Sequence, residues 1–428
     1  MISFFLLGAE KSSAQTDSLI LTVEDMFARG MENSLRVQAD LLNEQISGER
    51  SRTARDRYLP ELNIGLNAGF VGQPVIFQHG LQSPAYPDAP DWSQNYAVNL
   101  VQPIYQGGKI RRNIRKADVE RQIAASQTSA DRAEVKLQLL QQYMNLFCLY
   151  KQQEVLTRNI SESERRLADI RRMKKEGLIT NNDVLRSELQ LTNNRLAIEE
   201  AVNNLKLVSQ QLDIWLGLDE RTILIPDTMF LQVSTPLSTY EEYVQAAYHD
   251  DPEMQIMQMR SQLADNDVML AKAVYLPTVS LYAGNTLARP VSRTLDDLYN
   301  NNWNIGLSVS YSLSSLYTGR HKVKEMQHYV FLRENETRQK MQQIRMTIRT
   351  AFLRHQEAQD RVKALGQSIR QAQENYRIMQ NRYLEQLAIL TDLLDADNVR
   401  LESELRLTAA YTQVVYTYFE LQKACGRL

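Results

Sequence analysis

The fold is decided by one long stretch, residues 109–176, which reads KIRRNIRKADVERQIAASQTSADRAEVKLQLLQQYMNLFCLYKQQEVLTRNISESERRLADIRRMKKE. It contains neither glycine nor proline, the two residues least compatible with a helix interior. As one α-helix rising 1.5 Å per residue, this stretch would be about 100 Å long, several times the diameter of a small domain. The sequence therefore predicts an elongated, mainly helical protein.

A second helical run follows this stretch after a short tip. The tip spans residues 177–183, and the helical pattern then continues to residue 216, so we expect a helical hairpin over 109–216. Later in the chain another long run, residues 320–386, is interrupted only by Gly366, and together with the helical pattern that follows it predicts a second hairpin over 318–425. Two hairpins of the same size indicate an internal repeat.

The segments before the two hairpins are also alike. Residues 22–56 are predicted to form one helix, which Tyr58-Leu59-Pro60 ends because proline disfavours helix in the residue before it. Tyr275-Leu276-Pro277 occupies the same place in the second half. The predicted organisation is a signal-peptide remnant (1–14), a first repeat (15–216), a linker (217–238) and a second repeat (239–428).

Alternating apolar and polar residues lie between each Tyr-Leu-Pro motif and its hairpin. In the clearest case, Ile305 and Leu307 alternate with Asn304, Gly306 and Ser308. A period of two is typical of a strand with one apolar face. We expect four strands, at about 61–70, 94–102, 278–286 and 303–313, with a proline-rich loop over 71–93.

The polar faces of these strands carry asparagine, serine and glycine with scarcely a charge, which suits a water-filled lumen. Each strand has about the length that crosses a bilayer when tilted. Four strands cannot close a membrane barrel, so several copies of the chain would have to contribute strands to one barrel. A soluble sheet with one face on the helices is the alternative. The candidate lumen-facing residues are Asn95, Asn99, Asn304, Ser308 and Ser310.

Composition excludes several classes of protein. The formal net charge of −2 over 428 residues gives no excess of basic residues of the kind that binds nucleic acid. The sequence contains no run of 18 apolar residues, so it predicts no transmembrane helix. The five histidines lack metal-ligand spacing, and no nucleophile or phosphate-loop motif occurs. We therefore expect no enzyme, no metal site and no cofactor.

The two cysteines leave two possibilities. Cys148 and Cys425 lie at similar distances from the two helix tips along the chain. They form either a bridge in an oxidising compartment or a pair of buried free thiols. The apolar start of the chain, Ile2 to Leu7, with small residues before Gln15, resembles the end of a secretory signal and favours export.

Along the helices, apolar residues recur every three or four positions and predict a core between helices. In the first hairpin this seam comprises Leu185, Leu189, Leu196, Val202, Leu205, Leu212 and Leu216.

The order helix, Tyr-Leu-Pro, strand, loop, strand and long helical hairpin occurs twice in the chain, and it resembles the TolC family of outer-membrane factors. The most specific piece is RYLEQLAILTDLLDA at residues 382–396, which is similar to the family's second helix tip; its first-half equivalent is KKEGLITNNDVL at 174–185. The family's glycine is present as Gly177 but is Gln386 in the second tip. The resemblance covers nearly the whole chain.

The resemblance implies a homotrimer in the cell outer membrane. Its twelve strands would form one transmembrane β-barrel, continued through the periplasm by an α-helical barrel, with the linker at an equatorial belt. Such a channel is the exit duct of a tripartite efflux or type I secretion system. It contacts outer-membrane lipid, a periplasmic adaptor (membrane fusion protein) and an inner-membrane pump of the RND or ABC type. The alternative from another class is a soluble elongated coiled-coil scaffold.

The resemblance also assigns candidate working residues at the tips. Asp392 and Asp395 lie where the family places its constricting carboxylates; the alternative is that Asp392 caps the final helix and Asp395 lies in its first turn. Asp183 and Tyr383 lie where family members hold the tunnel closed. The family's basic partner is absent, since its position holds Ala388.

Overall fold

The computed structural model describes residues 18–227, 237–289 and 297–428, so the predicted signal-peptide remnant lies outside the described residues. The chain divides into two compact units. We call Met1–Leu41, Ser126–Gln255 and Lys340–Leu428 the helical unit, and Leu42–Ala125 and Ile256–Gln339 the strand unit.

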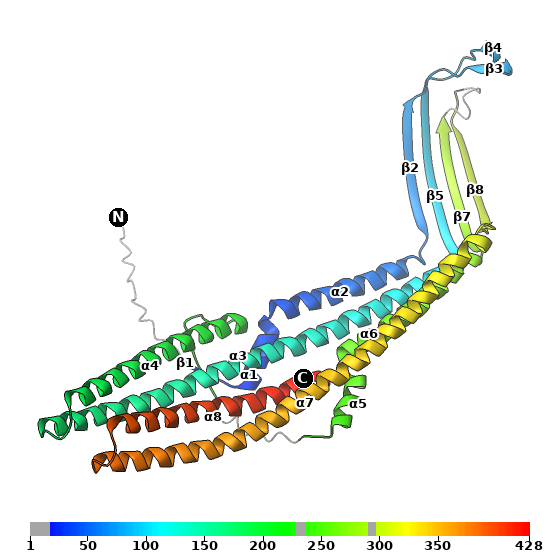
Figure 1. Cartoon of the computed structure of the whole chain (residues 1–428). Coiled ribbons are helices and arrows are strands. Elements are labelled where there is room, and N and C mark those ends of the chain that lie inside the picture. Colours follow the sequence, from blue (N-terminus) through cyan, green and yellow to red (C-terminus); the bar gives the residue numbers. More distant parts are fainter. Residues whose placement is uncertain (1–17, 228–236, 290–296) are drawn as a thin grey trace, which may run out of the picture. The chain divides into compact units, whose positions relative to one another are not determined.

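The strand unit contains one four-stranded antiparallel sheet in the order β2-β5-β7-β8 (Figure 1). Each repeat supplies two neighbouring strands, and β5 pairs with β7 to join them. The two repeats therefore share one sheet. Its strands are β2 (Glu61–Phe70), β5 (Trp92–Gln106), β7 (Thr278–Arg289) and β8 (Asn300–Ser310).

Three of these strands differ in extent from the sequence prediction. β5 runs beyond residue 102 through Pro103, where the register shifts between Pro103 and Tyr105. Proline is tolerated at such a bulge because it has no N–H to give to the ladder. β7 continues to Arg289, and β8 begins at Asn300 rather than at residue 303. Its first residues are asparagines, whose low strand propensity concealed the start.

The predicted loop over 71–93 also contains regular structure. A short hairpin forms from β3 (Ile76–His79) and β4 (Gln82–Ala85). It turns at Gly80, whose φ of 61° is the left-handed conformation that glycine adopts without steric cost. The prolines of this segment hid two strands of only four residues each.

Two shorter helices precede the sheet strands, α2 (Leu35–Asp56) before β2 and α6 (Pro252–Lys272) before β7. Both end a few residues before their Tyr-Leu-Pro motif, as the motif predicts. The predicted single helix over 22–56 is wrong, because the chain breaks at Ser34, which is extended. Ser34 is a favourable residue for capping the next helix, and its Oγ accepts a hydrogen bond from the main-chain N of Val37.

The helical unit is built on two long helical hairpins (Figure 1). The first joins α3 (Lys109–Lys175) to α4 (Asn181–Leu216), and the second joins α7 (Ser315–Leu384) to α8 (Leu390–Ala424). α3 and α7 also contribute residues to the strand unit. Among the described residues, none of the helices combines the length and the apolar character needed to cross a membrane.

Small elements complete the helical unit. They are α1 (Val23–Asn33), α5 (Tyr240–Asp250), β1 (Ser18–Leu21) and β6 (Ile223–Pro226). β1 and β6 pair in parallel. The predicted linker, 217–238, therefore includes a strand in its described part.

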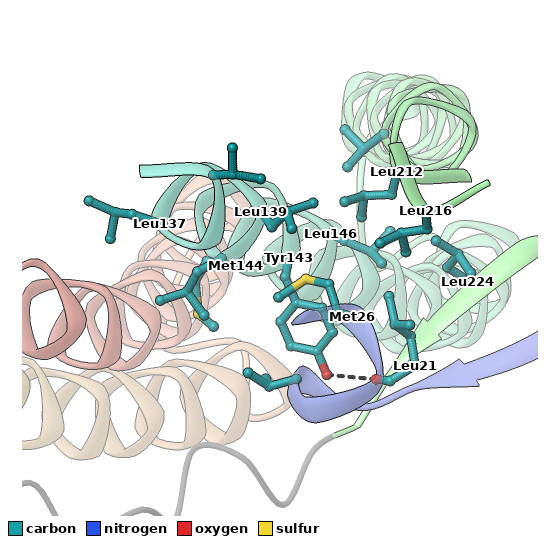
Figure 2. Close-up of a cluster of buried hydrophobic side chains, with 14 of the residues drawn as sticks. Leu21, Met26, Leu137, Leu139, Tyr143, Met144, Leu146, Leu212, Leu216 and Leu224 are labelled. Carbon is teal, nitrogen blue, oxygen red and sulfur yellow. Dashed lines mark hydrogen bonds between the residues drawn. The ribbon is translucent and has the colours of Figure 1, made fainter. Parts of the chain in front are cut away.

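The main core of the helical unit surrounds Tyr143 of α3 (Figure 2). The Tyr143 hydroxyl donates to the main-chain oxygen of Leu21 at 2.8 Å and accepts from the main-chain N of Asp227 at 2.9 Å. These bonds fix β1 and the residue after β6 to α3. Buried side chains around it include Met26, Leu139, Leu146, Leu212, Leu216 and Leu224.

The predicted seam of α4 is only half correct. Leu205, Leu212 and Leu216 are buried, but Leu189 and Leu196 are 62% and 59% exposed, and Leu185 is exposed as well. Near the tip, α4 turns other residues inward, among them Val184 and Leu191. An apolar stripe of α4 is thus left uncovered by the described residues of this chain.

Both cysteines are free. The Cys148 sulfur lies 3.3 Å from the Thr412 hydroxyl oxygen. Thr412 precedes Cys425 by 13 residues (425 − 412), or about 20 Å along α8. Because a disulfide needs Cα atoms within about 7 Å, the bridge is excluded.

Candidate functional site

Each hairpin turns at its tip through one residue in the left-handed conformation. Gly177 has φ 75° and Gln386 has φ 60°. The two tips also share a main-chain hydrogen bond. The main-chain N of Leu178 donates to the main-chain oxygen of Met173, and that of Leu387 donates to the main-chain oxygen of Arg382. The second tip keeps the backbone of the first without its glycine, at a cost of about 1–2 kcal/mol.

In the first tip, Asp183 closes the start of α4. Its carboxylate accepts hydrogen bonds from the main-chain N of Thr180 at 3.0 Å and from the Thr180 hydroxyl at 2.7 Å. Thr180 is the N-cap residue, and the pair forms a capping box. The structure thus gives this gate candidate a local role.

In the second tip, the corresponding N-cap residue is Ile389, which has no hydroxyl. Because Ile389 is the N-cap residue and the Asp392 carboxylate accepts no hydrogen bond from the described residues, the alternative that Asp392 caps α8 is wrong. Asp392 lies in the first turn, where the helix dipole favours a carboxylate, and Asp395 lies in the second turn. Both are exposed, and neither makes a hydrogen bond or ion pair with any part of the chain that the structure describes.

Tyr383, the other gate candidate, lies near Asp183 but is not bonded to it. Tyr383 is only 7% exposed, and its hydroxyl has no hydrogen-bond partner within the described residues. Burial, and then the Asp183 charge, raise the pKa of Tyr383. The phenol therefore stays protonated and is a hydrogen-bond donor.

An ion cluster close to these residues was missed from the sequence. Arg166 of α3 donates to Asp397 of α8 at 2.5 Å, and Arg400 donates to Asp397 at 2.9 Å and to Glu162 at 2.5 Å. The Arg400 guanidinium lies 4.4 Å from the centre of the Tyr376 ring on α7. The cluster links three helices of the two hairpins.

A signal for this cluster was present in the pattern. Leu390 and Leu393 are buried, and Asp397 follows at the next position of the same three- and four-residue spacing. A carboxylate on an apolar stripe predicts a buried partner, because an unpaired buried charge is strongly destabilising.

In the strand unit, two of the predicted lumen-facing residues, Asn99 and Asn304, are connected by strand pairing through Gly284. Asn99 pairs with Gly284, which pairs with Asn304. A Cβ at Gly284 would lie 2.9 Å from the Asn99 amide oxygen and 3.1 Å from that of Asn304. Both amides therefore lean over the glycine on one face of the sheet.

The remaining polar positions follow the same register. Ser308 and Ser310 pair with Ser280 and Thr278, and Asn95 pairs with Ala288. Register also adds residues to this polar face that the prediction did not include, namely Asn63, Asn67, Thr286, Asn300 and Asn302. Over the described ranges, no group of three or more His, Cys, Asp or Glu side chains could hold a metal ion.

A sequence profile described as outer membrane efflux protein matches residues 29–218 and 243–427. A search of curated proteins finds no significant match.

Solved structures match over most of the chain. The chain is similar to VceC, an outer membrane protein of Vibrio cholerae, at 17% identity, with 94% of this chain and 96% of that chain covered and a TM-score of 0.76. The chain is similar to CusC at 14% identity, with 97% of this chain and 95% of that chain covered and a TM-score of 0.81. It is similar to the CmeC outer membrane channel of Campylobacter jejuni at 15% identity, with 94% of this chain and 85% of that chain covered and a TM-score of 0.74. The predicted mainly α fold with duplicated strands and helical hairpins is confirmed.

Proposed function

The chain belongs to the outer membrane efflux protein family, and we propose that it is the exit duct of a tripartite efflux or type I secretion system. In this role it is a homotrimeric, passive conduit in the outer membrane, with its helices forming a tunnel in the periplasm. Its partners are outer-membrane lipid, a periplasmic adaptor and an inner-membrane pump of the RND or ABC type. It acts on no substrate covalently and needs no cofactor.

The observation that carries this proposal is the four-stranded sheet. One face holds the asparagines and serines described above, and the other holds apolar side chains. On the apolar face, Leu66 is 71% and Ile305 63% exposed, so the described residues of the chain do not cover it. A polar face suits water and an uncovered apolar face suits lipid, which is the alternation of a membrane strand.

The edges of the sheet argue for several copies. Within the described residues, β2 and β8 each pair on one side only. Unpaired backbone groups in lipid cost several kcal/mol each, and four strands are too few to close a barrel. Three copies would bring twelve strands together and pair every edge.

The uncovered stripe of α4 supports contacts between copies in the helical unit. Leu185, Leu189 and Leu196 are apolar and exposed at helical spacing. A helix side of this kind is typical of packing against another helix. A neighbouring copy supplies such a helix without any further partner.

Light scattering on the purified protein, with and without detergent, tests the proposal. We expect a detergent-requiring particle of three chain masses, each 49.4 kDa. The double substitution Leu189→Arg with Leu196→Arg should dissociate it, whereas Glu199→Arg, at an exposed polar position of the same helix, should not. A monodisperse monomer in plain buffer would contradict the proposal and favour the soluble scaffold.

A further inference from the structure

The two ends of the four sheet strands differ in charge. At one end the strands join the helices, and the register places Gln106, Thr278 and Ser310 side by side there. The ten residues on the helix side of each strand together hold ten lysines or arginines and one aspartate, Asp56. The segments that link the strands at their other end, residues 71–91 and 290–299, hold four aspartates and one arginine. The excess of positive charge therefore belongs to the helix side alone.

Half of these ten cations are exposed and have no partner. Three others form ion pairs. The five exposed ones make no hydrogen bond, ion pair or cation–π contact with any described residue, and we call them the basic belt: Arg57, Arg111, Arg115, Lys272 and Arg320. Each of the four junctions between a strand and a helix supplies at least one of them. Because the junctions are far apart in sequence, the belt is not the product of one locally charged helix.

Exposed apolar or aromatic side chains lie on the sheet side of these cations. There is one at each junction: Leu59, Tyr105, Leu276 and Tyr317. Tyr317 is 72% exposed and lies three residues before Arg320 in α7, so the two share one side of the helix. A ring followed by a long cationic side chain is the order found at a membrane–water interface. This side of α7 therefore suits the interface better than a water-filled lumen.

The position of the belt along the helices fits a headgroup layer. Arg111 lies two residues after the first residue of α3, and Arg320 lies five residues after that of α7. These steps correspond to about 3 and 8 Å along the helix axis. A bilayer core of about 30 Å grows to about 40–45 Å with its headgroups, so each headgroup layer is about 5–8 Å thick. If the strands span the core, the cations lie at the depth of the phosphates.

We infer that the basic belt binds the headgroups of anionic phospholipids in the periplasmic leaflet of the outer membrane. The inference rests on the proposed conduit, because it takes the strands as the membrane-spanning segments. It adds the chemical class of lipid that the helix side of the barrel selects. A phosphatidylcholine headgroup carries its own cation beside the phosphate, so the belt favours phosphatidylglycerol, whose net charge is negative. In three copies the belt forms a ring around the barrel.

Native mass spectrometry of the full-length protein in detergent tests the inference. Palmitoyl-oleoyl phosphatidylglycerol and palmitoyl-oleoyl phosphatidylcholine are titrated separately, since they share acyl chains and differ in net charge. We expect the parent to bind phosphatidylglycerol at least about fivefold more tightly, the effect of one cation beside an anionic headgroup. The belt variant, with Arg111→Gln, Arg115→Gln and Arg320→Gln, should reduce this preference to about twofold or less.

The matched control removes the same charge from the same two helices away from the sheet. Arg165, Arg338 and Arg370 are exposed, have no partner among the described residues, and lie 23 residues (338 − 315) or more beyond the first residue of their helix. Replacing all three with glutamine should keep the preference of the parent.

The same spectra also report the number of chains in the particle, so they separate this inference from the proposed conduit. A trimer that binds both lipids equally, or a preference that survives in the belt variant, would overturn the inference and leave the conduit standing. A particle of one chain mass would contradict the conduit and the inference with it. Loss of the trimer in the belt variant, without a lipid preference in the parent, would assign the cations to contacts between copies instead.

Discussion

Asn33 donates a hydrogen bond from its side-chain amide to the main-chain oxygen of Leu216 at 3.0 Å. The last turn of α1 thereby caps the last turn of α4, whose final carbonyls have no partner inside the helix. The chain then leaves α4 through Gly217, which has φ 67°. The end of α8 repeats this arrangement, because Gly426 has φ 77° and packs against the main chain of Asp250.

Both glycines should be sensitive to substitution, because each combines a left-handed backbone with a close neighbour. A Cβ at Gly217 would lie 2.6 Å from the Asn33 side-chain oxygen, and one at Gly426 would lie 2.5 Å from the Asp250 carbonyl carbon. We expect Gly217→Ala and Gly426→Ala each to destabilise the protein by more than the roughly 1–2 kcal/mol that the left-handed backbone alone costs. Thermal unfolding followed by circular dichroism measures this.

The matched control is Gly366, which lies inside α7 with open space around it. Gly366→Ala should stabilise the protein by about 0.5–1 kcal/mol, because alanine is favoured over glycine in a helix interior. If all three substitutions had the same effect, the helix-end packing described here would be wrong.

The second tip offers a substitution with the opposite sign. Gln386 holds the left-handed conformation in which Gly177 stands in the first tip. Gln386→Gly should stabilise the protein by about 0.5–1 kcal/mol, after allowing for the greater freedom of glycine in the unfolded chain. Gln386→Ala keeps the backbone strain and should change little, so an equal gain from both variants would show that the side chain, not φ, is responsible.

The elements that could be predicted from sequence are those with a strong local period. Alternation at Ile305 and Leu307 predicted β8, and the absence of glycine and proline predicted α3. Pro60 and Pro277 marked the ends of the helices before the sheet, because proline acts on its own neighbours. The prediction was wrong for Leu189 and Leu196, which lie at helical spacing but are exposed. A spacing of three and four residues identifies an apolar side of a helix, but it does not tell whether the same chain or another copy covers that side.

The candidate site was less accessible to prediction for the same reason. That Asp183 belongs to a capping box could have been read from Thr180 three residues earlier. The burial of Tyr383 and its distance from any acceptor depend on how α3 packs on α7, which no local pattern contains. The Arg166–Asp397 pair joins residues far apart in sequence, and only the carboxylate on an apolar stripe hinted at it.

Asp213 should make stability depend on pH. It is fully buried in α4, and both carboxylate oxygens lack a hydrogen-bond partner among the described residues. Burial, with smaller effects of Asp219 and Glu220, raises its pKa from 3.8 to about 7. Between these values the folded protein keeps a proton that the unfolded chain releases, so stability should fall as pH rises from about 4 to 7 and level off above that range.

Asp213→Asn removes this titration and should flatten that part of the profile of unfolding temperature against pH. Glu199→Gln replaces an exposed carboxylate of the same helix and should keep the parent slope. A parent-like slope in Asp213→Asn would mean that another group carries the pH dependence.

Asp392 and Asp395 should bind multivalent cations at the mouth of the proposed trimer. Positions i and i+3 share a helix face, so the carboxylates of three copies would form two rings one turn apart. In planar bilayers, cobalt hexammine added on the tip side should block the parent channel, and replacing both residues with alanine should raise the half-blocking concentration by at least about 100-fold, equivalent to about 2.8 kcal/mol. Asp360→Ala removes an exposed carboxylate that is paired with Lys363 away from the tip, and should leave the block intact. Because neither Asp392 nor Asp395 has a partner within the described residues, their removal should not disturb the fold. Unchanged block in the double variant would therefore exclude these carboxylates as the constriction.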